Sequence, residues 1–132
     1  MRIESAEDLT VYKSAYSLAM EIFELTKGFS SEEKFVLTSQ IRRSWRSVCF
    51  NLREAWAKRR YEAHFVNKLT DCDGENSETD SALDFASDCG YISAEQHEGL
   101  AAKCVEIGRM LGGVMRKPES FILPTPGQIS DI

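Results

Sequence analysis

The sequence predicts an all-α fold: an antiparallel up-down-up-down four-helix bundle followed by a non-helical, proline-containing C-terminal tail. Apolar residues recur at three- and four-residue steps over four stretches, which is the period of amphipathic helices. Short connections separate these stretches, and short connections make successive helices antiparallel. All three prolines follow residue 117, so they leave the helix interiors unbroken. We therefore expect a bundle over residues 1–117 and a tail over residues 118–132.

The first helix is expected from about Asp8 to Lys27, where Gly28 can end it. Its predicted core stripe is Leu9, Tyr12, Tyr16, Ala19, Phe23 and Thr26. Ser30 and Glu33 have the spacing of a capping box, so the second helix is predicted to begin there.

The second helix should run to about Arg60. Its predicted core stripe is Ile41, Trp45, Val48, Leu52 and Ala55. A short connection within residues 60–63 then leads into the third helix. The third seam comprises Phe65, Leu69, Cys72, Asn76, Thr79, Leu83 and Ala86, with Asn76 and Thr79 as polar members.

The remaining boundaries also have local signals. Gly90 is predicted to end the third helix as a C-terminal cap. Ser93 and Gln96 form a second capping box, which starts a helix from Ala94 to Lys117. This helix should bury Leu100, Cys104, Ile107, Leu111 and Val114. The tail carries enough apolar residues to pack on another part of the molecule: Phe121, Ile122, Leu123, Ile129 and Ile132.

Charge is segregated along the chain. The net charge of −5 argues against a protein that coats nucleic acid generally, because affinity for phosphates comes from summed cationic charge. Yet seven of the sixteen Lys and Arg residues lie between Arg42 and Arg60, where Glu54 is the only acid. Seven acids and no base lie between Asp71 and Asp88. A local basic surface is therefore still possible.

Two charged stripes have matching positions on the second and third helices. With the connection centred near residue 63, three pairs lie level along the hairpin: Arg42 with Asp84, Arg46 with Asp80, and Arg53 with Asp73. If the stripes face each other, they form ion pairs worth about 0.2–1 kcal/mol each. If they point away, the basic and acidic edges of neighbouring subunits can meet head to tail and close a ring. The sequence leaves both arrangements open.

A basic face left free would suit RNA or DNA. The candidate nucleic-acid-binding residues are Arg42, Arg43, Arg46, Arg53, Lys58, Arg59 and Arg60. Trp45 and Trp56 could stack on bases, although tryptophans at such positions are more often core or interface residues.

Asn51 and Glu54 are neighbours on one helical turn. A specific polar contact to another helix or subunit is a better explanation of this pair than catalysis. The candidate structural or interface polar residues are Asn51, Glu54, Asp73, Asp80 and Asp84.

The sequence contains none of the motifs expected of common enzymes. The four cysteines are at least fifteen residues apart, so they form no metal-binding pair and are best read as reduced, buried thiols. Neither histidine has Glu three residues earlier, as a di-iron bundle requires. We predict no catalytic residue, cofactor or metal.

The N-terminus has no apolar signal-peptide core and no stretch is long enough to span a bilayer, so we expect a soluble, cytoplasmic protein.

The chain resembles a small four-helix-bundle family named after reading frames in the intervening sequences of bacterial 23S rRNA genes, with relatives among the accessory proteins of retroelements. The resemblance covers roughly residues 8–117. It rests on Asp8-Leu9 with Val11-Tyr12, Glu24-Leu25-Thr26-Lys27, Phe35 with Leu37-Thr38-Ser39-Gln40-Ile41-Arg42-Arg43, Asn51 and Glu54, Phe65, Gly74 with Glu78, Gly90-Tyr91, and Ile107-Gly108-Arg109-Met110-Leu111.

This resemblance implies a homopentameric ring of unassigned molecular activity, and for the retroelement relatives a basic surface that contacts nucleic acid and a reverse transcriptase. The chain also departs from the family pattern. The family usually has proline, alanine and glycine at positions 49, 53 and 55, and serine at 75 with apolar residues at 76 and 79. Here these positions carry Cys49, Arg53, Ala55, Glu75, Asn76 and Thr79. We predict a self-assembling scaffold, with a nucleic-acid-binding accessory protein as the alternative.

Overall fold

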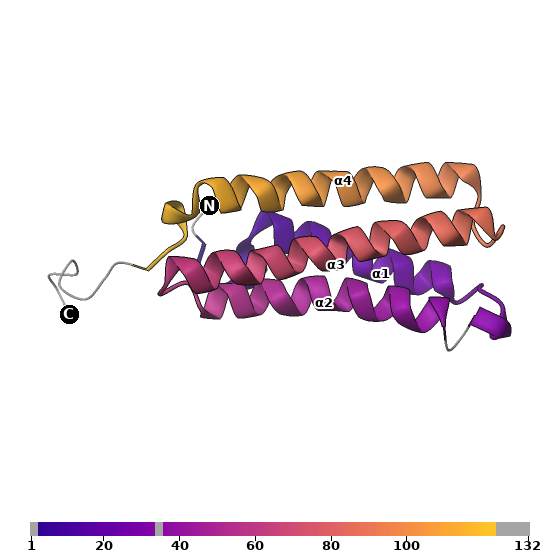
Figure 1. Cartoon of the computed structure of the whole chain (residues 1–132), viewed down its shortest axis with the longest axis horizontal. Helices are drawn as coiled ribbons and strands as arrows, with labels where there is room; N and C mark the ends of the chain where they lie inside the picture. Colours follow the sequence, from indigo (N-terminus) through magenta and orange to yellow (C-terminus); the bar gives the residue numbers. More distant parts are fainter. Residues whose placement is uncertain (1–2, 34–35, 124–132) are drawn as a thin grey trace, which may run out of the picture.

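Four long helices lie side by side in the computed structural model, which describes residues 3–33 and 36–123 (Figure 1). They are α1 (Thr10–Thr26), α2 (Leu37–Ala57), α3 (Glu62–Asp88) and α4 (Ala94–Arg116). Three single turns of 3-10 helix accompany them: η1 (Ala6–Asp8), η2 (Ser31–Glu33) and η3 (Pro118–Ser120). The described ranges contain no strand. The predicted antiparallel four-helix bundle is therefore confirmed.

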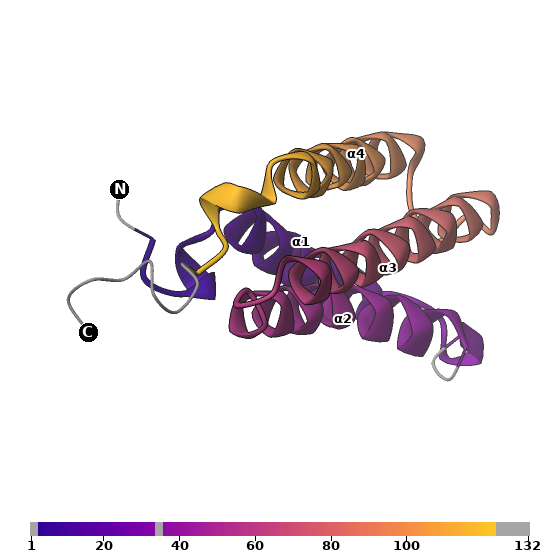
Figure 2. The same ribbon diagram turned by 60° about the vertical axis from the view of Figure 1, so that its left-hand side comes forward.

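Each helix packs against its neighbours in the chain, and α1 also packs against α4, which closes the bundle (Figure 2). The predicted stripes of α2 and α3 form the centre of the core. Every member of both stripes is at most 6% exposed, including the polar Asn76 and Thr79. On α4, Leu100, Cys104, Ile107 and Leu111 are buried, whereas Val114 is only partly buried.

The core face of α1 differs from the predicted one. Ala15, Leu18 and Ile22 are the residues that fill the middle of the bundle, at 0–1% exposure. Tyr16, which was expected in the core, is 53% exposed. The reason is that α1 carries apolar residues over an arc wider than its buried stripe, so two sets of three- and four-residue steps are both apolar. Of the predicted stripe, Leu9, Tyr12 and Thr26 are buried and Ala19 and Phe23 are partly buried, so the prediction was wrong for Tyr16 and lacked Ala15, Leu18 and Ile22.

The start of α2 also differs. Ser30 and Glu33 do not cap this helix: the Glu33 N–H donates to the Ser30 carbonyl at 3.1 Å and closes the separate turn η2. The helix begins at Leu37 instead. Phe35, part of the family pattern, lies outside the described residues. The other end was predicted more closely, since α2 ends at Ala57 and α3 begins at Glu62.

The boundary between α3 and α4 has the predicted caps. Gly90 has φ +77°, the left-handed conformation that favours glycine. The Tyr91 N–H donates to the Ala86 carbonyl at 2.9 Å and the Gly90 N–H to Ser87 at 3.0 Å, which is the Schellman pattern. Ser93 then caps α4 through its hydrogen bond from the Gln96 N–H, at 3.0 Å.

The first part of the tail packs on the turn between α2 and α3. Phe121 stacks on Phe65 with ring centroids 6.2 Å apart, and the Leu123 N–H donates to the Arg59 carbonyl at 3.1 Å. The tail is not wholly non-helical, because η3 forms its first turn. Residues 124–132, including Ile129 and Ile132, lie outside the described part.

Candidate interaction surfaces

The arginine stripe of α2 faces α1. Arg42 donates from Nε to Thr26 Oγ1 at 2.7 Å, and its guanidinium carbon lies 4.8 Å from the centroid of the Phe23 ring. Arg53 donates from Nη2 to Glu7 Oε1 at 2.6 Å and from Nε to the Tyr12 hydroxyl at 3.1 Å. These two hydrogen bonds raise the pKa of Arg53. Both arginines therefore bind to the α1 side of the bundle.

The aspartate stripe of α3 faces α4. Asp84 Oδ1 lies 2.8 Å from His97 Nε2. Burial is the main cause of a raised pKa at Asp80, and the nearby Asp84 raises it further. Asp73 packs near Gly108, where a Cβ would lie 3.9 Å from Asp73 Oδ1.

The two stripes therefore point to opposite faces of the molecule, the second of the two arrangements that the sequence left open. Among the described residues no ion pair joins Arg42 to Asp84, Arg46 to Asp80 or Arg53 to Asp73. The remaining stripe cation, Arg46, is exposed, and in the part of the chain that the structure covers it has neither a hydrogen bond nor an ion pair.

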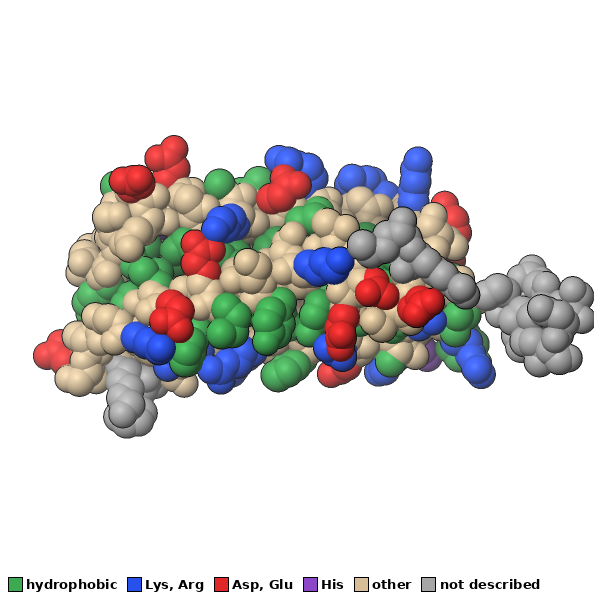
Figure 3. Space-filling model, turned by 180° about the vertical axis from the view of Figure 1, so that it is seen from behind, with side chains coloured by type: hydrophobic (Ala, Val, Ile, Leu, Met, Phe, Trp, Pro, Cys, Tyr) green, Lys and Arg blue, Asp and Glu red, His purple; other side chains and the backbone are tan. Residues whose placement is uncertain are grey.

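An apolar groove lies between α1 and α2, beside the arginines. It has a volume of about 370 Å³. Three of its lining side chains are large, apolar and exposed: Phe50 by 64%, Tyr16 by 53% and Met20 by 46%. Arg42 and Arg46 line it too. Figure 3, which looks at this side, shows hydrophobic side chains in a row with Lys and Arg next to them. Such a cluster is typical of a surface that another molecule covers.

Sequence reasoning missed the three exposed residues of this groove. Tyr16 and Met20 are four residues apart, as neighbours on one face of α1 must be. Phe50 lies outside the core stripe of α2. The available signal was therefore an apolar surplus on both helices beyond what one core stripe requires.

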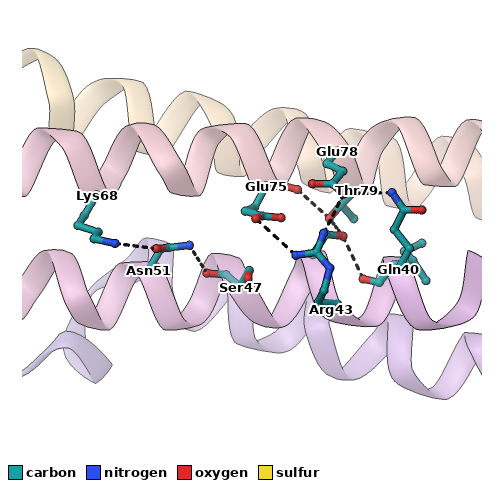
Figure 4. A network of polar contacts seen from close by, with 10 residues as sticks. Gln40, Arg43, Ser47, Asn51, Lys68, Glu75, Glu78 and Thr79 are labelled. Carbon is teal, nitrogen blue, oxygen red and sulfur yellow. Dashed lines mark hydrogen bonds and ion pairs between the residues drawn. The ribbon is translucent and has the colours of Figure 1, made fainter.

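A polar network joins α2 to α3 on another side (Figure 4). Arg43 lies between two carboxylates, with Nη2 2.9 Å from Glu78 and Nη1 3.7 Å from Glu75. Gln40 donates to Glu78 at 3.0 Å. Burial and the neighbouring Glu78 raise the pKa of Glu75, while the Gln40 hydrogen bond is the main cause of a lowered pKa at Glu78. Arg43 thus belongs to an intramolecular contact.

Asn51 and Glu54 meet a single cation from the neighbouring helix. Lys68 Nζ of α3 lies 2.7 Å from Glu54 Oε2 and 3.5 Å from Asn51 Oδ1 (Figure 4 shows the second contact). Asn51 also donates to the Ser47 carbonyl at 2.9 Å. The hydrogen bond from Lys68 lowers the pKa of Glu54. Both residues therefore make a polar contact to another helix of the same chain; whether they contact another subunit stays a prediction.

The other candidate cations gather at the α2–α3 turn. Lys58 and Arg60 are exposed, and Arg59 places its guanidinium carbon 3.8 Å from the centre of the Trp56 ring. Trp45 is fully buried and so unavailable for base stacking.

The described residues offer little for catalysis. No group of three or more His, Cys, Asp or Glu side chains in them is placed to hold a metal ion. The four cysteines were predicted to be buried, and three of them are, whereas Cys89 is exposed because it lies at the C-terminal end of α3. Burial raises the pKa of the Cys49 thiol to about 11 and of the Cys72 and Cys104 thiols to about 12, which keeps them protonated and unreactive at neutral pH. No helix in the described ranges is long and apolar enough to cross a membrane.

These features define a four-helix bundle whose conspicuous surfaces suit contacts with other macromolecules. The model of the family described as "23S rRNA-intervening sequence protein" matches residues 7–113, and the chain belongs to this family. The resemblance inferred from the sequence is thereby confirmed for this family, while the relation to retroelement accessory proteins stays a prediction.

One similar solved structure is a protein of unknown function from the S23 ribosomal protein family of Bacteroides thetaiotaomicron. It is 32% identical, with a TM-score of 0.75, over 81% of this chain and 96% of that chain. The comparison with curated proteins gives no match. The findings indicate a family of unknown function and name no enzymatic activity.

Proposed function

We propose that this protein is a non-enzymatic scaffold that assembles with copies of itself, through contact between the α1–α2 groove of one copy and the α3–α4 face of the next. The observation that carries the proposal is the separation of charge: exposed Arg46 beside an apolar groove on one face, and Asp80 and Asp84 on the opposite face. Faces of opposite charge attract each other between copies, whereas a two-fold contact through either face would bring like charges together.

The acidic face also offers an apolar side chain. On α4, His97 and Gly108 face α3, through contacts with Asp84 and Asn76 respectively. Val105 follows His97 by eight residues and precedes Gly108 by three, so it lies on the same side of the helix as both. It is 58% exposed. Val105 can therefore cover part of the groove that Tyr16, Met20 and Phe50 form.

Unlike faces generate a ring when the rotation between copies closes on itself. Five copies is the number that the family resemblance implies, so we propose a homopentamer.

Charge reversal at one unpaired residue tests the assembly. Sedimentation velocity and light scattering at micromolar concentration should give an oligomer for the wild type and a monomer for Arg46→Glu. Arg60→Glu is the matched control, because Arg60 is also exposed and unpaired among the described residues but does not line the groove; it should assemble normally. Circular dichroism checks that both variants fold. A monomeric wild type, or an Arg46→Glu variant that assembles like the wild type, would refute the proposal.

A second proposed function is nucleic-acid binding as an accessory protein, with RNA, DNA or a reverse transcriptase as partner. One observation limits where this happens: Arg42, Arg43 and Arg53 are already held by partners within the chain. The cations at the α2–α3 turn are freer, and they favour this turn as the place of contact.

A further inference from the structure

We propose that the α2–α3 turn binds single-stranded nucleic acid through two free cations and exposed aromatic rings. This inference rests on the second proposed function and moves its site away from the groove arginines. The turn site consists of Lys58, Arg60, Tyr61 and His64, next to the stacked pair of Trp56 and Arg59.

The cations of the turn site are available to phosphate groups. In the described part of the chain Arg60 makes no ion pair or hydrogen bond. Lys58 lies near enough to Glu54 to lower the pKa of that carboxylate slightly, but Glu54 pairs at 2.7 Å with Lys68. Both cations therefore make no ion pair among the described residues, and Glu54, the acid next to Lys58, is occupied; Glu62, in the first turn of α3, is exposed.

The aromatic rings of the turn site are held ready for stacking. Tyr61 is 58% exposed, although it is a large aromatic residue directly before a helix. His64, one turn along α3, meets it edge-on with ring centroids 5.4 Å apart. Bases stack on such side chains with little regard to sequence, because every base has a π face.

The third cation of the turn strengthens the site by fixing its shape. Arg59 donates from Nη1 to the Trp56 carbonyl at 2.8 Å while its guanidinium covers the Trp56 ring. Its own carbonyl accepts from the Leu123 N–H at 3.1 Å. The turn is therefore held from both sides, and ordering it on binding costs little conformational entropy.

The combination favours single strands over other polyanions. A duplex hides its base faces in the stack, so it would meet only the cations. An acidic peptide or polyphosphate has no bases for Tyr61 and His64. Two contacted phosphates on a single strand predict a slope of about −1.4 for log K against log salt.

Fluorescence anisotropy with labelled single strands of about 12 nucleotides, both RNA and DNA, tests the turn site. We expect binding by the wild type that weakens with salt at the slope above. A duplex, polyphosphate and a poly-glutamate peptide should each bind more weakly. Lys58→Ala with Arg60→Ala should weaken single-strand binding at least fivefold. Tyr61→Ala should weaken it about fivefold or more, while Tyr61→Phe, which keeps the ring, should bind like the wild type.

Two further double variants remove two positive charges at other places, as the turn variant does. The groove variant is Arg42→Ala with Arg46→Ala. The other is Lys27→Ala with Arg109→Ala, two cations that pair with the exposed Glu24 and Glu106. Light scattering on every variant reports assembly separately. No binding by the wild type would overturn both the second proposed function and this inference. Binding that the groove variant abolishes and the turn variants leave unchanged would keep the function and overturn the inference. Tighter binding of polyphosphate, peptide or duplex than of single strands would also overturn it.

Discussion

Replacing Asn76 by leucine is expected to stabilise the bundle, although it removes a hydrogen bond. Asn76 is 6% exposed, and its Nδ2 donates to the Cys104 carbonyl at 2.9 Å. Its Oδ1 is buried with no partner among the described residues. A buried, unpaired acceptor costs about 1–3 kcal/mol, whereas a typical hydrogen bond contributes only about 0.5–1.5 kcal/mol net.

The leucine variant also gains apolar burial, which the change of side-chain shape partly offsets, because a branched group must fit where a planar amide now packs. Gly108, which faces this side chain, has no Cβ, and one added there would lie 3.4 Å from Asn76 Nδ2, an ordinary contact distance. Together these contributions give a net gain of about 1 kcal/mol in the free energy of unfolding. For a domain of this size the melting temperature should rise by about 3–5 °C. Urea unfolding and calorimetry measure both quantities.

Thr79→Val is the matched control with the opposite sign. The Thr79 hydroxyl has both its partners, Ser44 Oγ at 2.8 Å and the Glu75 carbonyl at 2.9 Å, so its removal should cost about 1 kcal/mol. Both positions are polar members of one seam, and they differ in that the Thr79 hydroxyl has its partners whereas Asn76 Oδ1 has none among the described residues. If Asn76→Leu lost stability as Thr79→Val does, the account of an unpaired amide oxygen would be refuted.

Three further predictions concern local conformation and protonation. Gly90→Ala should lower the free energy of unfolding by about 1–2 kcal/mol, because φ is +77° at this residue. Gly74→Ala, at an exposed position inside α3, should raise it by up to about 1 kcal/mol, because alanine favours the helix more than glycine does. Equal effects of the two variants in chemical denaturation would contradict this reasoning. Glu75→Gln should stabilise the protein at neutral pH but not in acid. The pKa of Glu75 is raised on folding, so the stability of the wild type falls as pH rises above the ordinary value of this carboxyl, near 4.5, whereas glutamine does not titrate. A difference in stability that does not change with pH would count against this reasoning. Lys68→Met should reduce the loss of stability on acidification. In the wild type the lowered pKa of Glu54 contributes stability that is present above pH 4.5 and is lost as pH falls through the lowered value. If the variant lost as much stability as the wild type in acid, this reasoning would be refuted.

Boundaries with strong local chemistry could be predicted from the sequence. Gly90 and the Ser93 capping box end one helix and start the next where expected, because the cap depends only on residues within a few positions. The prediction from the capping-box spacing of Ser30 and Glu33 was wrong, also because such a pattern depends only on nearby residues. The same spacing is compatible with the separate short turn η2, and no local feature requires that turn to continue into α2.

The direction of the charged stripes could not be predicted, because it depends on where the bundle places α1 and α4. Arg53 and Asp73 have equal offsets from their core stripes, which fits either facing or opposed arrangements. Tyr16 could not be placed for a related reason: both apolar sets on α1 satisfy helical periodicity, and only the groove with α2 explains the second one.

The opposed faces have a consequence for mixtures of wild-type and altered copies. If assembly runs head to tail, a copy with Arg46→Glu still has an intact Asp84 face. It can therefore bind the groove of one wild-type neighbour, but its own groove does not bind the next copy. Each such copy leaves one contact of its ring unmade and prevents that ring from closing, so the fraction of complete rings should fall faster than the fraction of wild-type copies in the mixture.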